Sequence, residues 1–167
     1  MNNLIDALEN FSEKTGRAIA WLTLLMVVIT FLVVVLRYVF DTGWIALQES
    51  VTYLHAMVFL LGAAYTMKQE AHVRVDIFYR KMNPTRQAWV DLLGGLLLLL
   101  PVCLFIFIAS WEYVVSSWSL LEGSPEAGGL PLVFLLKSCI LLMSGLVLLQ
   151  GLAHTLRAFA RLKVPHD

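Results

Sequence analysis

The sequence predicts an all-α integral membrane protein with four transmembrane helices, because 59% of its residues are hydrophobic and four apolar stretches divide the chain. Each stretch reaches the roughly 20 residues that a helix needs to cross a hydrocarbon core about 30 Å thick. The unbroken run Leu96–Leu100 lacks the in-out alternation of barrel strands, so helices are the structure that satisfies the backbone in lipid. We expect spans at residues 18–36, 46–67, 89–110 and 130–152.

The segments outside the spans are short, so they leave room for a single membrane domain. Residues 1–17 place apolar and acidic side chains on opposite sides of a helix, which predicts an amphipathic segment in the membrane interface; a frayed tail is the alternative. The loop 68–88 mixes apolar and basic residues and should also lie along the headgroups. Within it, Asn83 and Pro84 form a helix-start signal, and Pro101 should kink the third span.

Basic residues predict the orientation, because short loops rich in Lys and Arg stay in the cytoplasm. Ten of the 12 lie before the first span, in the 68–88 loop, or in the tail 153–167. The loop 111–129 contains three glutamates and no basic residue. We therefore expect both termini in the cytoplasm and the loop 111–129 on the outer side of the membrane.

The first apolar run does not resemble a signal peptide, since acidic residues precede it and no small-residue cleavage site follows. We expect it to be retained. The two cysteines, Cys103 and Cys139, lie within spans, where a thiol usually acts as a small packing residue.

Ionisable residues within membrane helices are candidates for function because they are costly to leave unpaired in hydrocarbon. The candidates are Arg37 at the end of span one, Glu49 and His55 in span two, and Lys137 in span four. We expect an interhelical pair of Glu49 with Arg37 or Lys137 near the outer surface. Structural pairing is favoured over ion translocation.

Two stripes of polar and small residues should face either the bundle interior or another subunit. One comprises Thr52, His55, Gly62 and Thr66, and the other comprises Lys137, Ser144 and Gly151. Aromatic residues near the span ends are expected to anchor the membrane interfaces. These anchors are Trp44, Trp89, Trp111 and Trp118.

The residues favour a scaffold or partner subunit over an enzyme. Haem ligation by His55 and His154 is disfavoured, because helix geometry places them about 14 Å and about 36 Å from the outer face. We expect no cofactor, no metal and no nucleic acid partner, since no nucleophile motif, phosphate loop or metal-ligand spacing occurs. Two rivals stay open: an autonomous homo-oligomeric transporter that uses Glu49 as its essential carboxylate, and a membrane redox anchor.

Several motifs together resemble a known family. They are Arg37-Tyr38-Val39-Phe40, then Trp44, Gln48-Glu49, Gly62-Ala63-Ala64-Tyr65 and Glu70-Ala71-His72-Val73-Arg74-Val75-Asp76, followed by Gly123-Ser124, Leu130-Pro131 and Lys137. Their order and spacing resemble the small membrane subunit, DctQ type, of tripartite ATP-independent periplasmic (TRAP) transporters. The resemblance covers nearly the whole chain.

The resemblance implies four transmembrane helices in the inner membrane of a bacterium, with the loop 111–129 in the periplasm, and a division of labour between three components. A large membrane subunit would carry the substrate and sodium sites, and a periplasmic binding protein would deliver an organic anion such as a dicarboxylate or sialic acid. The small subunit would brace the large one, with phospholipid around it and no catalytic residues. His72, Arg74 and Asp76 would then fasten the cytoplasmic loop, and the loops 41–47 and 111–129 would be open to the binding protein.

Overall fold

The computed structural model describes residues 2–69 and 76–163. Four helical stretches within this part are long and apolar enough to cross a membrane, which confirms the predicted fold class. The elements are α1 (Asn2–Tyr38), α2 (Ile45–Lys68), the short α3 (Asp76–Tyr79), α4 (Pro84–Gly94), the π-helix η1 (Gly95–Leu99), α5 (Leu100–Ser119) and α6 (Val133–Lys163). The third span is therefore the continuous stretch from α4 through η1 to α5.

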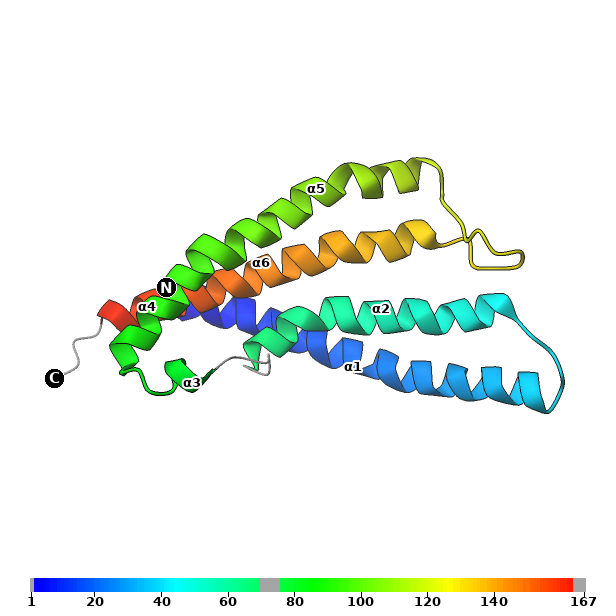
Figure 1. Ribbon diagram of the computed structural model, residues 1–167, viewed down its shortest axis with the longest axis horizontal. Helices are drawn as coiled ribbons and strands as arrows, with labels where there is room; N and C mark the ends of the chain where they lie inside the picture. Colours follow the sequence, from blue (N-terminus) through cyan, green and yellow to red (C-terminus); the bar gives the residue numbers. More distant parts are fainter. Residues whose placement is uncertain (1, 70–75, 164–167) are drawn as a thin grey trace.

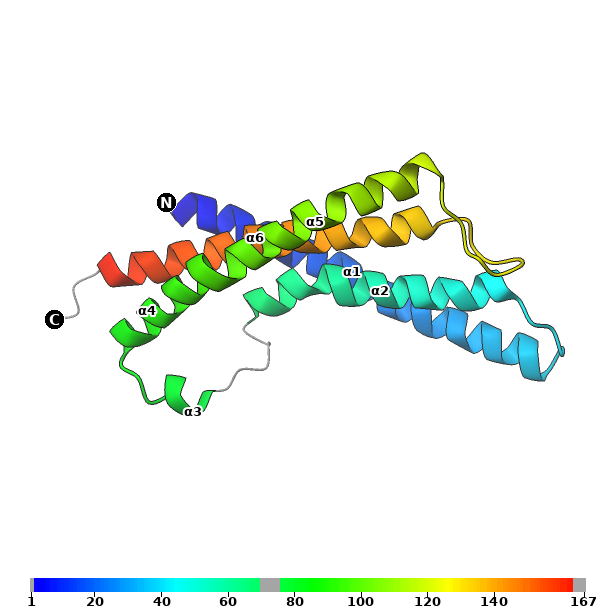
Figure 2. The ribbon, with the colours of Figure 1, turned by 45° about the horizontal axis from the view of Figure 1, so that its top comes forward.

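α6 is the central helix of the bundle, since it packs against α1, α2, α4 and α5. α1 and α2 form one antiparallel hairpin, and α5 and α6 form the other (Figure 1). The start of α1 and the end of α6 lie at the same end of the molecule (Figure 2), which we call the terminal end. The connections 39–44 and 120–132 lie at the opposite, hairpin end (Figure 1).

α1 continues without a break from the predicted amphipathic segment into the first span. Its buried face near the N-terminus includes Glu9 and Ser12 as well as Ile5, whereas Phe11 is 51% exposed. The prediction that the acidic residues of this segment lie on one exposed side is therefore wrong for Glu9, which is buried. Its position in the membrane interface stays a prediction. Further along, a Cβ on Gly16 would lie 2.7 Å from Tyr65 Cβ, so α1 crosses α2 at close range.

The third span begins at the helix start that the sequence predicts and contains a π-helix just before Pro101. Asn83 caps α4 by accepting a hydrogen bond from the Arg86 amide at 2.9 Å, and Pro84 occupies the first turn. Before Pro101 the helix widens into η1, where the Leu100 amide donates to the Gly95 carbonyl five residues back. Proline removes a donor from the helical ladder, and a π turn beside it is one way to accommodate that loss.

Small residues allow α6 to approach the third span closely. Ala64, Cys103 and Val147 form the centre of the core, with Leu99 and Met143 packed around them. On α6, Ser144 is fully buried and donates to its own helix backbone, and a Cβ on Gly151 would meet Leu99 Cδ2 at 2.7 Å. The stripe predicted on span four therefore faces the bundle interior.

Candidate functional site

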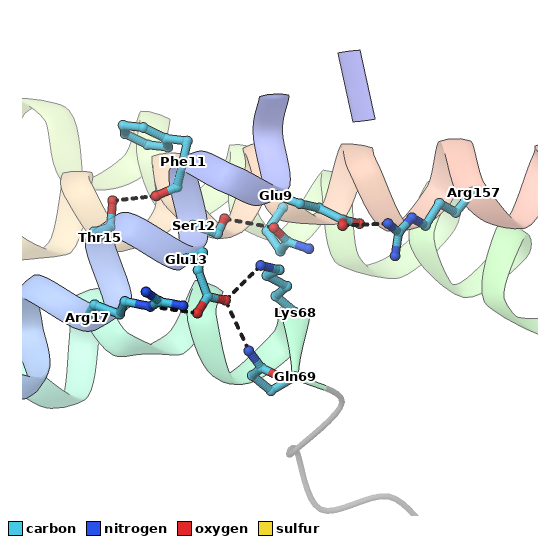
Figure 3. Close-up of polar contacts among 10 residues, drawn as sticks. Glu9, Phe11, Ser12, Glu13, Thr15, Arg17, Lys68, Gln69 and Arg157 are labelled. Atoms are coloured by element: carbon cyan, nitrogen blue, oxygen red, sulfur yellow. Dashed lines mark hydrogen bonds and ion pairs between the residues drawn. The ribbon is translucent and has the colours of Figure 1, made fainter. Parts of the chain in front are cut away.

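A polar cluster fastens the N-terminal half of α1 to α2 and α6. We call it the terminal cluster; it comprises Glu9, Ser12, Glu13, Lys68, Gln69, Gln150 and Arg157 (Figure 3). Arg157 Nη2 lies 2.5 Å from Glu9 Oε2, and the Ser12 hydroxyl donates to Gln150 Oε1 at 2.7 Å. These contacts join residues more than 130 positions apart, so side chains tie the first helix, α1, to the last, α6.

Glu13 provides the connection from α1 to α2. Its carboxylate pairs with Lys68 Nζ at 2.7 Å and with Arg17 Nε at 3.0 Å, and it accepts from Gln69 at 3.2 Å. The pocket beside this cluster, lined by Glu9, Gln150 and Arg157 among others, has a volume of about 30 Å³. Such a volume holds about one water molecule. The contacts of the terminal cluster join helices, and this pocket is too small to hold an organic solute.

A second polar cluster lies at the hairpin end. We call it the hairpin cluster; it comprises Glu49, Ser117, Glu122, Ser124, Leu130 and Lys137. Glu49 of α2 accepts from the Ser124 hydroxyl through Oε1 and from the Leu130 amide, at 2.6 Å, through Oε2. Glu122 lies 2.5 Å from Lys137 Nζ and accepts from the Ser117 hydroxyl at 2.6 Å. Glu49 thereby holds the α5–α6 loop against the start of α2.

The predicted pairing of Glu49 with Arg37 or Lys137 is wrong. Lys137 pairs with Glu122, and its Nζ also lies 4.0 Å from the centroid of the Tyr113 ring. Glu49 is satisfied by uncharged donors, and Arg37 is exposed at the end of α1. The hydrogen bond from Lys137, with that from Ser117, lowers the pKa of the Glu122 carboxyl below its ordinary value.

The end of α5 places an exposed leucine in a strained conformation. The Glu122 amide donates to the Ser117 carbonyl and the Leu121 amide to the Trp118 carbonyl, which defines a Schellman motif. Leu121 therefore occupies the left-handed position, with φ of 45°, where glycine is usual. A branched residue there costs about 1 kcal/mol or more. Leu120 and Leu121 are 75% and 64% exposed.

The loop after this turn needs glycine at Gly129. A Cβ at this position would lie 2.5 Å from Ser124 Oγ and 2.8 Å from Glu49 Oε2. Such approaches are too close for real side chains, so the hairpin cluster closes only around a residue without a Cβ. The Gly129 amide also donates to the Glu126 carbonyl at 3.0 Å, which completes an ordered turn.

The other predicted site residues have different positions. His55 is exposed on α2, and its ring stacks on Phe59 with centroids 6.5 Å apart. The four tryptophans proposed as anchors are 45–59% exposed, and Trp118 also donates to Ser138 Oγ at 2.8 Å. His72 and Arg74 lie outside the described residues, as does the side chain of Asp76. No residue in the described parts belongs to a group of three or more His, Cys, Asp or Glu side chains able to hold a metal ion.

Sequence reasoning missed most of both clusters. Glu9, Ser12 and Gly16 are spaced as one helical face, which is a signal for packing, although their partners are not visible in the sequence. Gln150 lies at the end of the predicted fourth span, and Arg157 lies just after it. A polar residue at such a position is usually assigned to solvent. Ser124 lies in a stretch recognisable only as a loop. Pairing across more than 70 positions leaves no local pattern.

These features define a helical, multi-pass membrane protein in which buried and half-buried polar side chains join helices to one another and to the α5–α6 loop. A family model confirms the resemblance that the motifs indicated. Residues 26–161 match the model described as "Tripartite ATP-independent periplasmic transporters, DctQ component". The chain belongs to this family and is a small permease component of a TRAP transporter.

Two relatives carry names that agree with this membership. A Haemophilus influenzae protein whose name places it among TRAP transporter small permeases is 30% identical over 105 residues, which cover 61% of this chain and 65% of the relative. The C4-dicarboxylate TRAP transporter small permease protein DctQ of Vibrio cholerae is 27% identical over 88 residues, covering 53% of this chain and 38% of the relative. The chain thus matches less than two thirds of either relative's length. No solved structure matches it.

Proposed function

We propose that this chain braces the large membrane subunit of a sodium-driven TRAP transporter while that subunit moves its solute. The observation that carries the proposal is that the carboxylates in both clusters are engaged in contacts within the chain. Glu9, Glu13, Glu49 and Glu122 each bind donors from a neighbouring helix or loop of the same chain. Carboxylates engaged in this way stabilise a fixed arrangement of helices, which is what a brace requires.

The solute class in this proposal is an organic anion, with uptake into the cell across the inner membrane. The Vibrio cholerae relative has C4-dicarboxylate in its name, which favours a carboxylate as the solute of this system. The small subunit would not bind the solute. His72, Arg74 and Asp76 would fasten the 68–88 loop to a neighbour or to lipid headgroups.

The experiment compares this chain alone with the chain in its complex. The chain is purified in mild detergent after co-expression with the other membrane component of its transporter, and solute uptake is measured in vesicles under a sodium gradient. We expect the large component to co-purify and uptake to need both chains together with the binding protein. Uptake by this chain alone would overturn the proposal in favour of an autonomous transporter.

The ordered hairpin-end loops would also help to dock the periplasmic binding protein. Leu120 and Leu121 are exposed beside the hairpin cluster, and the carboxylates of Glu112 and Glu126 are on exposed residues nearby in sequence. A photocrosslinker at residue 120 should react with the purified binding protein when it is added to the complex. Crosslinking no greater than from a site at the terminal end, such as residue 161, would contradict this role.

A further inference from the structure

One face of α2 carries polar and small residues that the described helices leave exposed or half-buried. We call it the α2 seam; it comprises Thr52, His55, Phe59, Gly62 and Thr66, at spacings of three and four residues. Thr52 and His55 are exposed, Phe59 is 74% exposed, and a Cβ on Gly62 would meet nothing within 4 Å. Tyr53 and Ala64, on the opposite side of α2, are buried. The seam therefore faces away from the bundle.

The depth of His55 makes this exposure unfavourable in lipid. The residue lies ten positions after Ile45 in a helix of 24 residues, or about 15 Å along a rod of about 36 Å. Stacking on Phe59 engages the face of the imidazole, whereas its N–H and its second nitrogen point outward from the ring edge. Acyl chains offer no hydrogen-bond partner to these nitrogens.

The stripe on α6 contains similar residues that other parts of the chain cover. Ser144 is fully buried and donates to the Ile140 carbonyl at 3.0 Å. Gly151 lies against Leu99, and Lys137 pairs with Glu122. The members of that stripe are buried or half-buried, whereas Thr52, His55 and Phe59 of the α2 seam are exposed. The two stripes resemble each other in sequence and differ in what covers them.

We propose that the α2 seam is the docking site for a transmembrane helix of the large subunit. That helix would present a hydrogen-bonding group opposite His55 and would approach closely over Gly62, since small residues let membrane helices pack backbone to backbone. Thr66 already donates to the Gly62 carbonyl at 3.0 Å, so the surface near Gly62 has no unsatisfied hydroxyl. This inference rests on the proposed function, because it assumes that a large membrane subunit is the partner.

Substitutions at Gly62 separate docking from folding. Gly62→Leu adds a side chain into open space, so the isolated subunit should keep its thermal stability, while the close approach of a partner helix is blocked. We expect the large subunit recovered per small subunit to fall at least about tenfold in mild detergent. Gly94→Leu is the matched control, since a Cβ there also meets nothing within 4 Å, and it should change recovery little.

His55→Leu tests the proposed hydrogen bond between His55 and the large subunit. Leucine is more compatible with lipid than histidine, so a lipid-facing position would tolerate this change, whereas a docked position would lose a partner. We expect recovery to fall about threefold, the usual size of one interhelical hydrogen bond in a membrane, and His55→Gln to restore part of it. Normal recovery with both His55→Leu and Gly62→Leu would overturn the seam as the docking site.

Cysteine crosslinking locates the partner directly. Thr52→Cys should crosslink to cysteines introduced in the large subunit, whereas Phe105→Cys, an exposed position on α5, should not. A Thr52→Cys dimer of this chain within the intact complex would overturn the proposal and identify a second copy as the occupant. If no large subunit co-purifies with the wild-type chain, the proposed function itself fails. Co-purification without any Thr52→Cys crosslink to the large subunit defeats only the seam.

Discussion

Glu49 shows that a carboxylate at the head of a membrane helix can be held without a cation. Its oxygens accept from the Ser124 hydroxyl and the Leu130 amide, both in the α5–α6 loop. Such bonds to an ionised acceptor are stronger than those between neutral groups. The residue expected to form an ion pair therefore organises a loop instead.

Replacing Glu49 with Gln should weaken this attachment. The amide group keeps one acceptor oxygen and puts a donor where an acceptor is needed, so Ser124 and Leu130 compete for one site. We expect a lower melting temperature of the purified subunit, and a modest loss of complex yield or uptake with the same solute preference. Glu112→Gln, at an exposed acid, should leave melting unchanged. A changed solute preference would contradict the structural role.

Glu122 should make stability depend on acid pH. Its pKa in the folded chain is lowered, first by the hydrogen bond from Lys137 and then by that from Ser117. The unfolded chain therefore binds the proton more tightly, and this stabilisation is complete above the ordinary value of 4.5 and declines as the pH falls through the folded pKa. Melting temperatures between pH 7 and pH 3 should show a smaller acid-dependent decrease for Glu122→Gln than for the wild type. Equal decreases would contradict this assignment.

At the scale of elements, close packing of α6 against η1 depends on glycine. A Cβ on Gly95 would clash with Thr155 Oγ1 and lie 3.3 Å from Thr155 Cβ. Thr155 is 4% exposed and donates to the Gly151 carbonyl, so it has little room to shift. The π-helix and the fourth span are thus fitted to each other at one contact.

Gly95→Ala should therefore destabilise the protein by about 1–3 kcal/mol, the usual effect of overpacking. Gly94→Ala is the matched control on the preceding residue, where a Cβ meets nothing within 4 Å. Alanine favours helix over glycine, so that change should be neutral or slightly stabilising. Unfolding of both variants in the same detergent measures the difference, and equal stabilities would show that η1 does not pack this tightly.

At the scale of the whole molecule, the two clusters lie at opposite ends and join different elements. The terminal cluster ties α1 to α2 and α6, and the hairpin cluster ties the α5–α6 loop to α2. The bundle is thereby fastened at both ends, while one face of α2 stays open between them. A bundle fastened at both ends would suit the proposed role of a brace.

The predicted orientation can be tested by labelling cysteines in intact cells. Cys103 and Cys139 are both buried and should give little background. Glu126→Cys should react with a membrane-impermeant maleimide added outside spheroplasts, whereas Arg161→Cys should react only after lysis, because basic loops stay in the cytoplasm. The reverse pattern would mean that the chain is inserted the other way.

The sequence by itself determined the four helical stretches long enough to cross a membrane, the helix start at Asn83 and the family, because span length, capping chemistry and motif order are local properties. It also identified Glu49, Lys137 and the two polar stripes as positions of interest. The tertiary structure alone decided which residues are partners. Lys137 pairs with Glu122, and Arg157 pairs with Glu9. It also decided that the stripe on α6 faces the bundle interior while the stripe on α2 faces outward. These outcomes depend on how helices distant in sequence rotate and cross, and side-chain spacing along one helix does not specify the orientation of its neighbour.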